Sequence, residues 1–345
     1  KMACNFGWDW GPPLLTCGVW RPAYLETWSA ARLGDARPVI TRADEERAEI
    51  DLRVDVAASS DGNPGEVFAE LLDPQGATVA SASRAADQPE VALALAVDSP
   101  RLWWPRGYGE QPRYDLKIEL RAQDGSVLDA RQHRAGLRTT ALCTDPDPEP
   151  HDGLGQGETM HLVVNGKRVY CKGANWIPDD CFPHRVTPER YRQRIDQAAD
   201  ANMNMLRIWG GGIYEDRSFY EHCDEIGMLV WQDFLLACAA YHEEEPFWSW
   251  FEAEARDNVS RLSPHPSLVL WCGCNENIWA TFDWSDQWRA IREEGKLTWG
   301  GGYYLDLFPR VVDELAPATP YCPGSPYSGT MDRHPNANEN GDTHM

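Results

Sequence analysis

The stretch Ser267-Leu-Val-Leu-Trp271-Cys-Gly-Cys-Asn275-Glu276 starts as an apolar run and ends in an amide and a carboxylic acid. Residues 267–271 have the length and the apolar character of a buried β-strand. Burial beside tryptophans can raise the pKa of a carboxylic acid until it keeps its proton near neutral pH. Glu276 is therefore a candidate proton donor. The simpler alternative is a Glu276 in an ordinary ion pair, with Asn275 capping the next helix.

Strands and helices alternate on both sides of this stretch, from about residue 160 onwards. Thr187 and Pro188 indicate the start of a helix, because Thr is a favoured N-cap and Pro suits the first helical position. Gly227 indicates the end of another helix. The predicted strands are 168–172, 205–209, 228–233 and 267–271, and the predicted helices are 187–201, 218–226, 246–262 and 304–315. This order predicts a parallel sheet, with a (β/α)8 barrel as the leading fold.

The chemically unusual residues directly follow the predicted strands. They are Asn175-Trp176, Trp209-Gly-Gly-Gly212, Asp233 and Asn275-Glu276. Active sites of (β/α)8 barrels lie at the carboxyl ends of the strands. A flavodoxin-like sheet would instead need a phosphate-binding loop, which the sequence lacks. The placement of these residues therefore favours the barrel.

Residues 38–142 show a different pattern, in which short strands are separated by turns. Residues 49–56 alternate polar and apolar side chains, as a half-buried strand does. Further strands are predicted at 66–72, 91–97 and 114–120, with turns at 73–76 and 124–125. This pattern predicts a small antiparallel β-sandwich. The Pro-rich run 145–150 is predicted to be a stiff linker that Gly153, Gly155 and Gly157 continue.

The composition limits the classes of partner and the compartment. The net charge of −22, from 32 basic and 54 acidic residues, argues against nucleic acid and anionic membranes. The sequence has no apolar run of about 18 residues, so it predicts no transmembrane helix. The 10 cysteines form no CxxC pair, so we expect reduced thiols in a cytoplasmic protein and no metal site. The 16 tryptophans can pack a core, but their faces can also stack on sugar rings.

Several blocks of the sequence resemble the glycoside hydrolases of family 2, and most closely the β-mannosidases of that family. In the family's order, they are Phe6-Gly-Trp-Asp-Trp-Gly-Pro12, Gly18-Val-Trp-Arg-Pro22, Trp103-Trp-Pro-Arg-Gly107, Lys172-Gly-Ala-Asn-Trp-Ile-Pro178, Arg207-Ile-Trp-Gly-Gly-Gly212, Trp231-Gln-Asp-Phe234 and Asn275-Glu276. The resemblance implies three domains. Residues 1–35, with a strand predicted at 18–25, are the end of a jelly-roll sugar-binding domain. Residues 36–143 are an immunoglobulin-like β-sandwich, and 144–345 are the N-terminal part of a TIM-barrel catalytic domain.

The resemblance also implies a function, the retaining hydrolysis of terminal β-D-mannose from a β-mannoside or manno-oligosaccharide, without a metal or cofactor. By similarity, Glu276 is the acid/base, and Asn275 hydrogen-bonds the 2-hydroxyl of the sugar. Trp209 and Trp284 line the subsite of the terminal sugar, and Asp9 reaches it from the preceding domain. Without the resemblance, a turn residue is the simpler interpretation of Asp9.

Two departures from the family pattern bear on this function. Cys274 stands where the family often has Asn, and we expect it to be a buried structural thiol. The family's nucleophile lies in a Ser-Glu-Phe-Gly-like segment near the seventh barrel strand, and this sequence has no such segment. We therefore expect the 345-residue chain alone to be inactive. The alternatives are another family 2 activity, such as a β-galactosidase or an exo-glucosaminidase, or a non-catalytic carbohydrate-binding fragment.

Two charged residues near the predicted strand ends have open roles. A buried Arg207 needs a carboxylate partner, and we expect it to steady the nucleophile. Asp233 either orients neighbouring groups or caps a helix.

Overall fold

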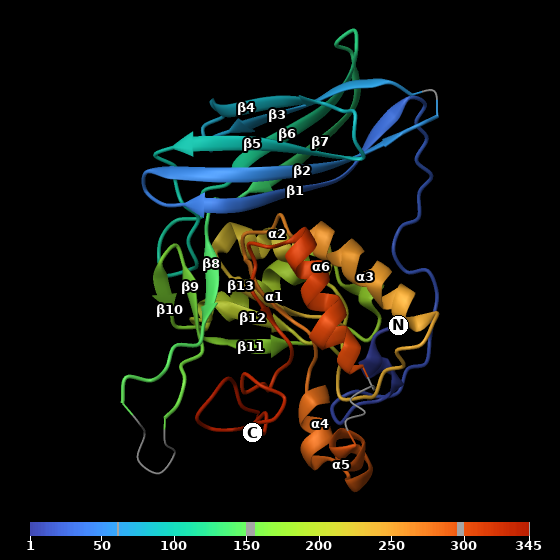
Figure 1. The fold of residues 1–345 in the computed structure, drawn as a ribbon, viewed down its shortest axis with the longest axis vertical. Coiled ribbons are helices and arrows are strands. Elements are labelled where there is room, and N and C mark those ends of the chain that lie inside the picture. The colour runs from blue at the N-terminus through green and yellow to red at the C-terminus, as the bar shows by residue number, and fades with distance from the viewer. Residues whose placement is uncertain (61, 150–155, 295–299, 345) are drawn as a thin grey trace.

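The computed structural model describes residues 1–60, 62–149, 156–294 and 300–344. An antiparallel sandwich lies over the helices of a second, α/β region, and a small antiparallel ladder joins the two (Figure 1). The predicted linker at 145–150 is described as far as Glu149, and Gly153 and Gly155 lie outside the described residues. Within the described residues, no helix combines the length and the apolar character needed to cross a membrane.

Two sheets form the sandwich, in agreement with the predicted short strands. One sheet has the order β1-β2-β5 and the other β4-β3-β6-β7. The strands are β1 (Ala31–Ala43), β2 (Arg47–Ala58), β3 (Pro64–Leu72), β4 (Thr78–Ala85), β5 (Glu90–Asp98), β6 (Tyr114–Ala122) and β7 (Val127–Ala135). Buried and partly exposed positions alternate along β2, β5 and β6, so every second side chain enters a core that both sheets share. Gly76 (φ 86°) and Gly125 (φ 84°) occupy the predicted turns.

The strand predicted at 18–25 is wrong, because these residues form no strand in the structure. The side chains of Val19, Tyr24 and Leu25 are 89%, 90% and 90% exposed. β-Branched and aromatic residues favour strands only where a neighbouring strand supplies hydrogen bonds and packing, and the described residues offer this segment no ladder partner. The first sandwich strand begins at Ala31, so the expected domain boundary at 35–36 falls inside β1.

The first strand of the parallel sheet lies later in the chain than predicted. Residues 167–169 form β10 (Lys167–Val169), which pairs antiparallel with β9 (His161–Val164), and β9 pairs with β8 (Thr140–Cys143). Asn165 and Gly166, with φ of 50° and 74°, form the two-residue turn that favours such a hairpin. The first parallel strand is instead β11 (Gly173–Trp176), so Asn175 and Trp176 lie within a strand and not after one.

The α/β region contains a five-stranded parallel sheet whose strands follow one another in sequence order, β11-β12-β13-β14-β15. The other strands are β12 (Met205–Ile208), β13 (Leu229–Asp233), β14 (Leu268–Cys272) and β15 (Tyr321–Cys322). Its helices are α1 (Pro188–Asp200), α2 (Arg217–Ile226), α3 (Phe247–Leu262), α4 (Asn277–Asp283), α5 (Asp286–Glu293) and α6 (Phe308–Leu315), which a π-helical turn (Tyr303–Leu307) precedes. Short 3-10 helices lie at Ala3–Phe6 and Pro183–Arg185. The predicted parallel order is therefore confirmed, whereas α4 and α5 were not predicted.

The predicted helix ends of this region are confirmed. The Thr187 side chain accepts a hydrogen bond from the backbone N–H of Arg190, and Pro188 is the first residue of α1. Gly227 ends α2 with a left-handed backbone (φ 75°), which costs glycine little.

The contact between the sandwich and the α/β region is hydrogen-bonded as well as packed. Trp103 is fully buried, and its Nε1 donates to the carbonyl of Asp224 at 2.9 Å. The buried Arg138 donates to the carbonyls of Pro266 (3.0 Å) and Leu268 (2.6 Å), at the start of β14. The sandwich therefore holds the strand that leads to Glu276.

Candidate active site

Three buried polar side chains meet at the carboxyl ends of β12, β13 and β14. Arg207 donates from Nη2 to Asp233 Oδ2 at 2.8 Å and to Asn275 Oδ1 at 2.9 Å, and from Nε to Asp233 Oδ1 at 3.1 Å. Burial alone would lower the pKa of Arg207, but the charge and hydrogen bonds of Asp233, together with the nearby Cys272 and Asp342, outweigh it and hold that pKa above its usual value. Arg207 thus stays charged and fixes the position of the Asn275 amide.

Asp233 orients its neighbours and caps no helix, which settles the alternative left open above. Its side chain is fully buried, and besides Arg207 it accepts hydrogen bonds from the backbone N–H of Gly210 and from Trp231 Nε1, both at 3.0 Å. The expected carboxylate partner of Arg207 is therefore Asp233.

Glu276 directly follows Asn275 and is the residue that precedes α4. Its backbone is left-handed (φ 63°, ψ 0°), a conformation that costs a non-glycine residue about 1–3 kcal/mol and is concentrated at functional sites. Its side chain is 23% exposed; Oε1 lies 2.7 Å from Nδ1 of His344, and Oε2 lies 3.3 Å from Sγ of Cys238. Two hydrogen-bonding side chains thus hold the carboxylate at the edge of the sheet.

The predicted rise in the pKa of Glu276 is wrong for this structure. Burial does raise that pKa, but the hydrogen bonds from His344 and Cys238 outweigh it and hold the pKa below its usual value. The sequence argument counted only the neighbouring tryptophans, whereas the carboxylate contacts two donors that come from distant parts of the chain.

Cys238 and His344 were missed by sequence reasoning. Cys238 Sγ lies 3.3 Å from both Glu276 Oε2 and Asn275 Nδ2, and burial together with the Glu276 charge raises the pKa of the thiol to about 12. The thiol therefore stays neutral and can donate to the carboxylate. Its position five residues after Asp233, beyond the end of a buried strand, was the available signal for Cys238. No comparable pattern singled out His344.

The N-terminal segment packs against the same end of the sheet. The Trp209 ring meets the rings of Trp8 (centroids 4.8 Å apart) and Trp10 (5.8 Å) edge to face. The backbone N–H of Cys4 donates to the carbonyl of Gly211 at 3.0 Å. These contacts bring Asp9, between the two tryptophans, to the region of Trp209. Among the described residues, the exposed Asp9 carboxylate has no hydrogen-bond or ion-pair partner.

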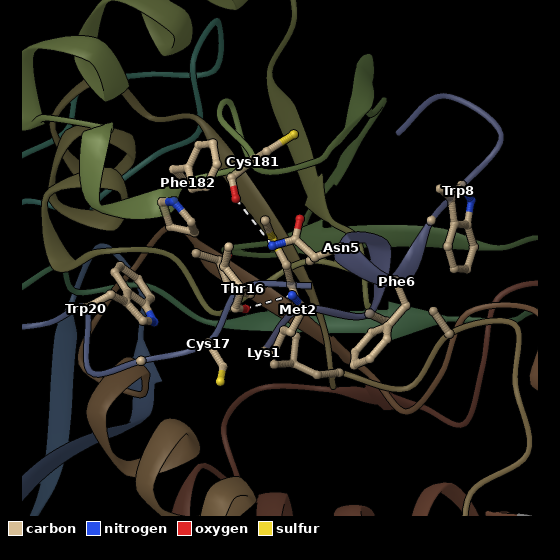
Figure 2. Close-up of a pocket in the computed structure, with 18 of the residues that line it drawn as sticks. Lys1, Met2, Asn5, Phe6, Trp8, Thr16, Cys17, Trp20, Cys181 and Phe182 are labelled. Atoms are coloured by element: carbon tan, nitrogen blue, oxygen red, sulfur yellow. Dashed lines mark hydrogen bonds between the residues drawn. The ribbon is translucent and has the colours of Figure 1, made fainter. Parts of the chain in front are cut away.

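A cavity of about 880 Å³ lies between the N-terminal segment, loops that follow the parallel strands, and α3. Figure 2 shows Lys1, Asn5, Trp20 and Phe182 around it, and Asn5 Nδ2 donates to the carbonyl of Cys181 at 3.3 Å. Glu276 does not line this cavity. Cys238 does, so one side chain contacts both the cavity and the carboxylate.

Among the described residues, the ring of Trp284 makes no contact with the ring of Trp209. It ends α4, is 42% exposed, and meets the ring of Trp279 with centroids 6.2 Å apart. Cys274, as expected, is a buried free thiol whose pKa burial raises well above its usual value.

Among the described residues at the strand ends, no three metal-type ligand atoms lie close together. In the described residues, one group of three metal-type ligands occurs elsewhere, at Cys143, Asp145 and His161.

Comparison with known proteins identifies a family model and proteins to which this chain is similar. Residues 33–138 match the model of the glycosyl hydrolases family 2. Beta-mannosidase B from Thermothelomyces thermophilus is 37% identical over 97% of this chain and 39% of that protein. Beta-mannosidase B from Emericella nidulans is 34% identical over 95% of this chain and 38% of that protein. The chain therefore spans about two fifths of the length of these relatives.

Solved structures give the same result for the fold. The crystal structure of a β-D-mannosidase from Dictyoglomus thermophilum matches all of this chain and 41% of its own, with a TM-score of 0.88 and 38% identity. A β-glucuronidase from Bacteroides uniformis matches 85% of this chain and 34% of its own, with a TM-score of 0.65 and 19% identity, and so shares the fold.

Proposed function

The chain resembles the β-mannosidases of glycosyl hydrolase family 2, and we propose that it forms the part of a retaining exo-β-mannosidase that carries the acid/base, Glu276. The observation that supports this most strongly is the position of Asn275 and Glu276 at the carboxyl edge of the parallel sheet. There the Arg207–Asp233 pair fixes the Asn275 amide, and the segment with Asp9 packs nearby.

The domain assignment is part of the same proposal. Residues 36–143, extended to Ala31 where β1 begins, are an immunoglobulin-like sandwich, and the residues before β1 are the end of the jelly-roll domain expected at 1–35. Residues 144–345 are the first part of a TIM barrel. Two facing antiparallel sheets support the first assignment, and parallel strands in sequence order with helices between them support the last.

In the proposed mechanism, a carboxylate attacks the anomeric carbon while Glu276 gives its proton to the departing glycosidic oxygen. Water then attacks the glycosyl ester and gives a proton to Glu276, which releases mannose with retained configuration. The second carboxylate would stand about 5 Å from Glu276. Its negative charge would raise the pKa of Glu276, which is needed because the neighbours described here hold that pKa below its usual value.

Substrate contacts follow from which polar atoms remain free. Arg207 is always a donor, so it fixes Oδ1 of Asn275 towards itself, and one N–H of the Asn275 amide donates to Cys238 Sγ. The second N–H of this amide would donate to the 2-hydroxyl of mannose, a contact that strengthens in the transition state. Trp209 and Trp284 would line the sugar subsite, and the unpartnered Asp9 carboxylate would accept bonds from sugar hydroxyls.

The ten cysteines are free thiols, which supports the expected reducing, cytoplasmic location.

Hydrolysis of a panel of aryl glycosides by the protein at its relatives' full length tests this proposal. We expect β-mannoside to be cleaved with a far higher kcat/KM than β-galactoside or β-glucuronide. A preference for galactoside or glucosaminide would replace the proposal with another family 2 activity. No turnover of any glycoside, with measurable binding of mannose, would make the protein a carbohydrate-binding one.

A further inference from the structure

One face of the ladder formed by β8 and β9 gathers a thiol, a carboxylate and an imidazole. Cys143 on β8 and His161 on β9 are directly paired residues of the antiparallel register. The pairing continues beyond the strands: Thr159 N–H donates to the carbonyl of Asp145, and Pro146 bridges Glu158. Since side chains alternate between the two faces of a strand, Asp145 shares the face of Cys143. One potential ligand atom from each of Cys143, Asp145 and His161 lies within 4.8 Å of the others.

Two of these three groups have no other partner among the residues that the structure describes. In the described part of the chain, neither the Cys143 thiol nor the Asp145 carboxylate makes a side-chain hydrogen bond or ion pair. The imidazole of His161 is held by one contact, from Nδ1 to Oγ1 of Thr159 at 3.2 Å. If Nδ1 carries the proton and donates it to Thr159, Nε2 keeps a lone pair for a metal ion. A neighbour that fixes the tautomer in this way is typical of metal-binding histidines.

We propose that Cys143, Asp145 and His161 bind a divalent metal ion, with Zn²⁺ as the preferred one. Thiolate, imidazole and carboxylate are the three ligand types of protein zinc sites, whereas Mg²⁺ and Ca²⁺ take oxygen ligands. Around tetrahedral Zn²⁺, sulfur and nitrogen ligands lie about 3.5 Å apart. Side-chain rotations that shorten the distances between these ligand atoms by about 1 Å would therefore let them occupy three of the four coordination positions of Zn²⁺, and water would occupy the fourth.

The place of this site in the fold suggests a structural role. The ladder carries the chain from the sandwich to the parallel sheet, and the metal ion would link the residues that follow β8 to the start of β9 (Figure 1). Glu276 belongs to another sheet, so metal binding and the proposed hydrolysis are separable. A ligand that binds only the folded state raises stability in proportion to the logarithm of its concentration.

The test is metal binding by the metal-free chain under reducing conditions. Zn²⁺ affinity is measured by competition with a chromophoric chelator, and Co²⁺ is used as a spectroscopic probe because a bound thiolate gives a sulfur-to-cobalt charge-transfer band. We expect one equivalent of Zn²⁺, a thiolate band with Co²⁺, and a higher unfolding temperature with Zn²⁺. Cys143→Ser should abolish the band, and His161→Gln should weaken Zn²⁺ binding at least about tenfold. Cys171→Ser, at an exposed thiol outside the proposed site, is the control and should behave like the parent.

Circular dichroism of each metal-free variant shows that it is folded, and His161→Gln serves if Cys143→Ser does not fold. Absence of a thiolate band in the parent would overturn the site. So would a band that survives in Cys143→Ser or disappears in Cys171→Ser.

Discussion

The sandwich and the parallel sheet differ in which side chains they bury. Along β6, positions alternate between buried and partly exposed, and the core that the two sandwich sheets share is apolar. Every residue of β12 and β14 is buried, and one of them is Arg207, which pairs with the fully buried Asp233. Burying charge is costly even when it is paired. The apolar core of the sandwich therefore mainly stabilises the fold, whereas the parallel sheet is less stable than it could be because it holds polar groups at one edge.

The largest expected effect comes from Asp233→Ala, which leaves the Arg207 charge buried without its partner. Removing one member of a buried ion pair costs about 3–5 kcal/mol of unfolding free energy. The matched control is Glu119→Ala in the sandwich. That carboxylate accepts from Arg121 at 2.7 Å but is 35% exposed, so its loss should cost less than about 1 kcal/mol. Urea unfolding measures both, and equal losses would remove the contrast between the two regions.

A core truncation in the sandwich should affect stability alone. Leu116 in β6 is fully buried, and Leu116→Ala should cost about 2–5 kcal/mol through lost packing and the cavity it leaves. Val127→Ala, at a side chain that is 53% exposed, should change stability by less than about 0.5 kcal/mol. In the protein at its relatives' full length, kinetics of the folded fraction of Leu116→Ala should match the parent. Altered kinetics at low temperature would mean that the sandwich shapes the site directly.

The same contrast explains what could be predicted from the sequence. Alternation at 49–56 and apolar runs such as 267–271 follow from how each kind of strand is buried, so an antiparallel sandwich and a parallel sheet could both be predicted. The position of Asn275 and Glu276 at a strand end followed from the parallel order. The partners of Glu276 did not, because Cys238 and His344 are 38 and 68 residues away and only the tertiary fold joins them. The prediction of a strand at 18–25 was wrong for a related reason, because a strand needs a neighbouring strand as hydrogen-bond partner, which the local sequence does not show.

In the protein at its relatives' full length, Asp9→Ala is expected to act on binding and not on stability. An exposed carboxylate without a protein partner contributes little to folding, but as a charged acceptor for sugar hydroxyls it is worth about 1.5–3 kcal/mol, roughly a ten- to hundredfold loss of kcat/KM. Asp9→Asn keeps an acceptor and should lose less. If Asp9→Ala instead unfolds several degrees earlier with normal kinetics, Asp9 is a turn residue.

The smallest effect is a pKa change at Glu276. His344→Ala removes the donor to Oε1 while burial remains, so the pKa of Glu276 should rise. In the parent, the folded-state pKa lies below the unfolded value. Glu276 therefore adds stability at a pH above the unfolded pKa, and that contribution disappears as the pH falls through the folded pKa. Titration of the Glu276 carboxyl carbon by NMR measures the change, and an unchanged or lower pKa in His344→Ala would exclude His344 as the cause.

The assignment of Glu276 as acid/base is tested most directly by Glu276→Gln in the protein at its relatives' full length, with the exposed Glu293→Gln as control. Hydrolysis of mannosides with poor leaving groups should slow by about 10²- to 10⁴-fold, whereas an activated phenol, which needs no proton, should be released with a much smaller loss. Azide needs no base, so it should restore turnover and yield β-mannosyl azide. Equal losses for good and poor leaving groups, with no azide product, would contradict the account.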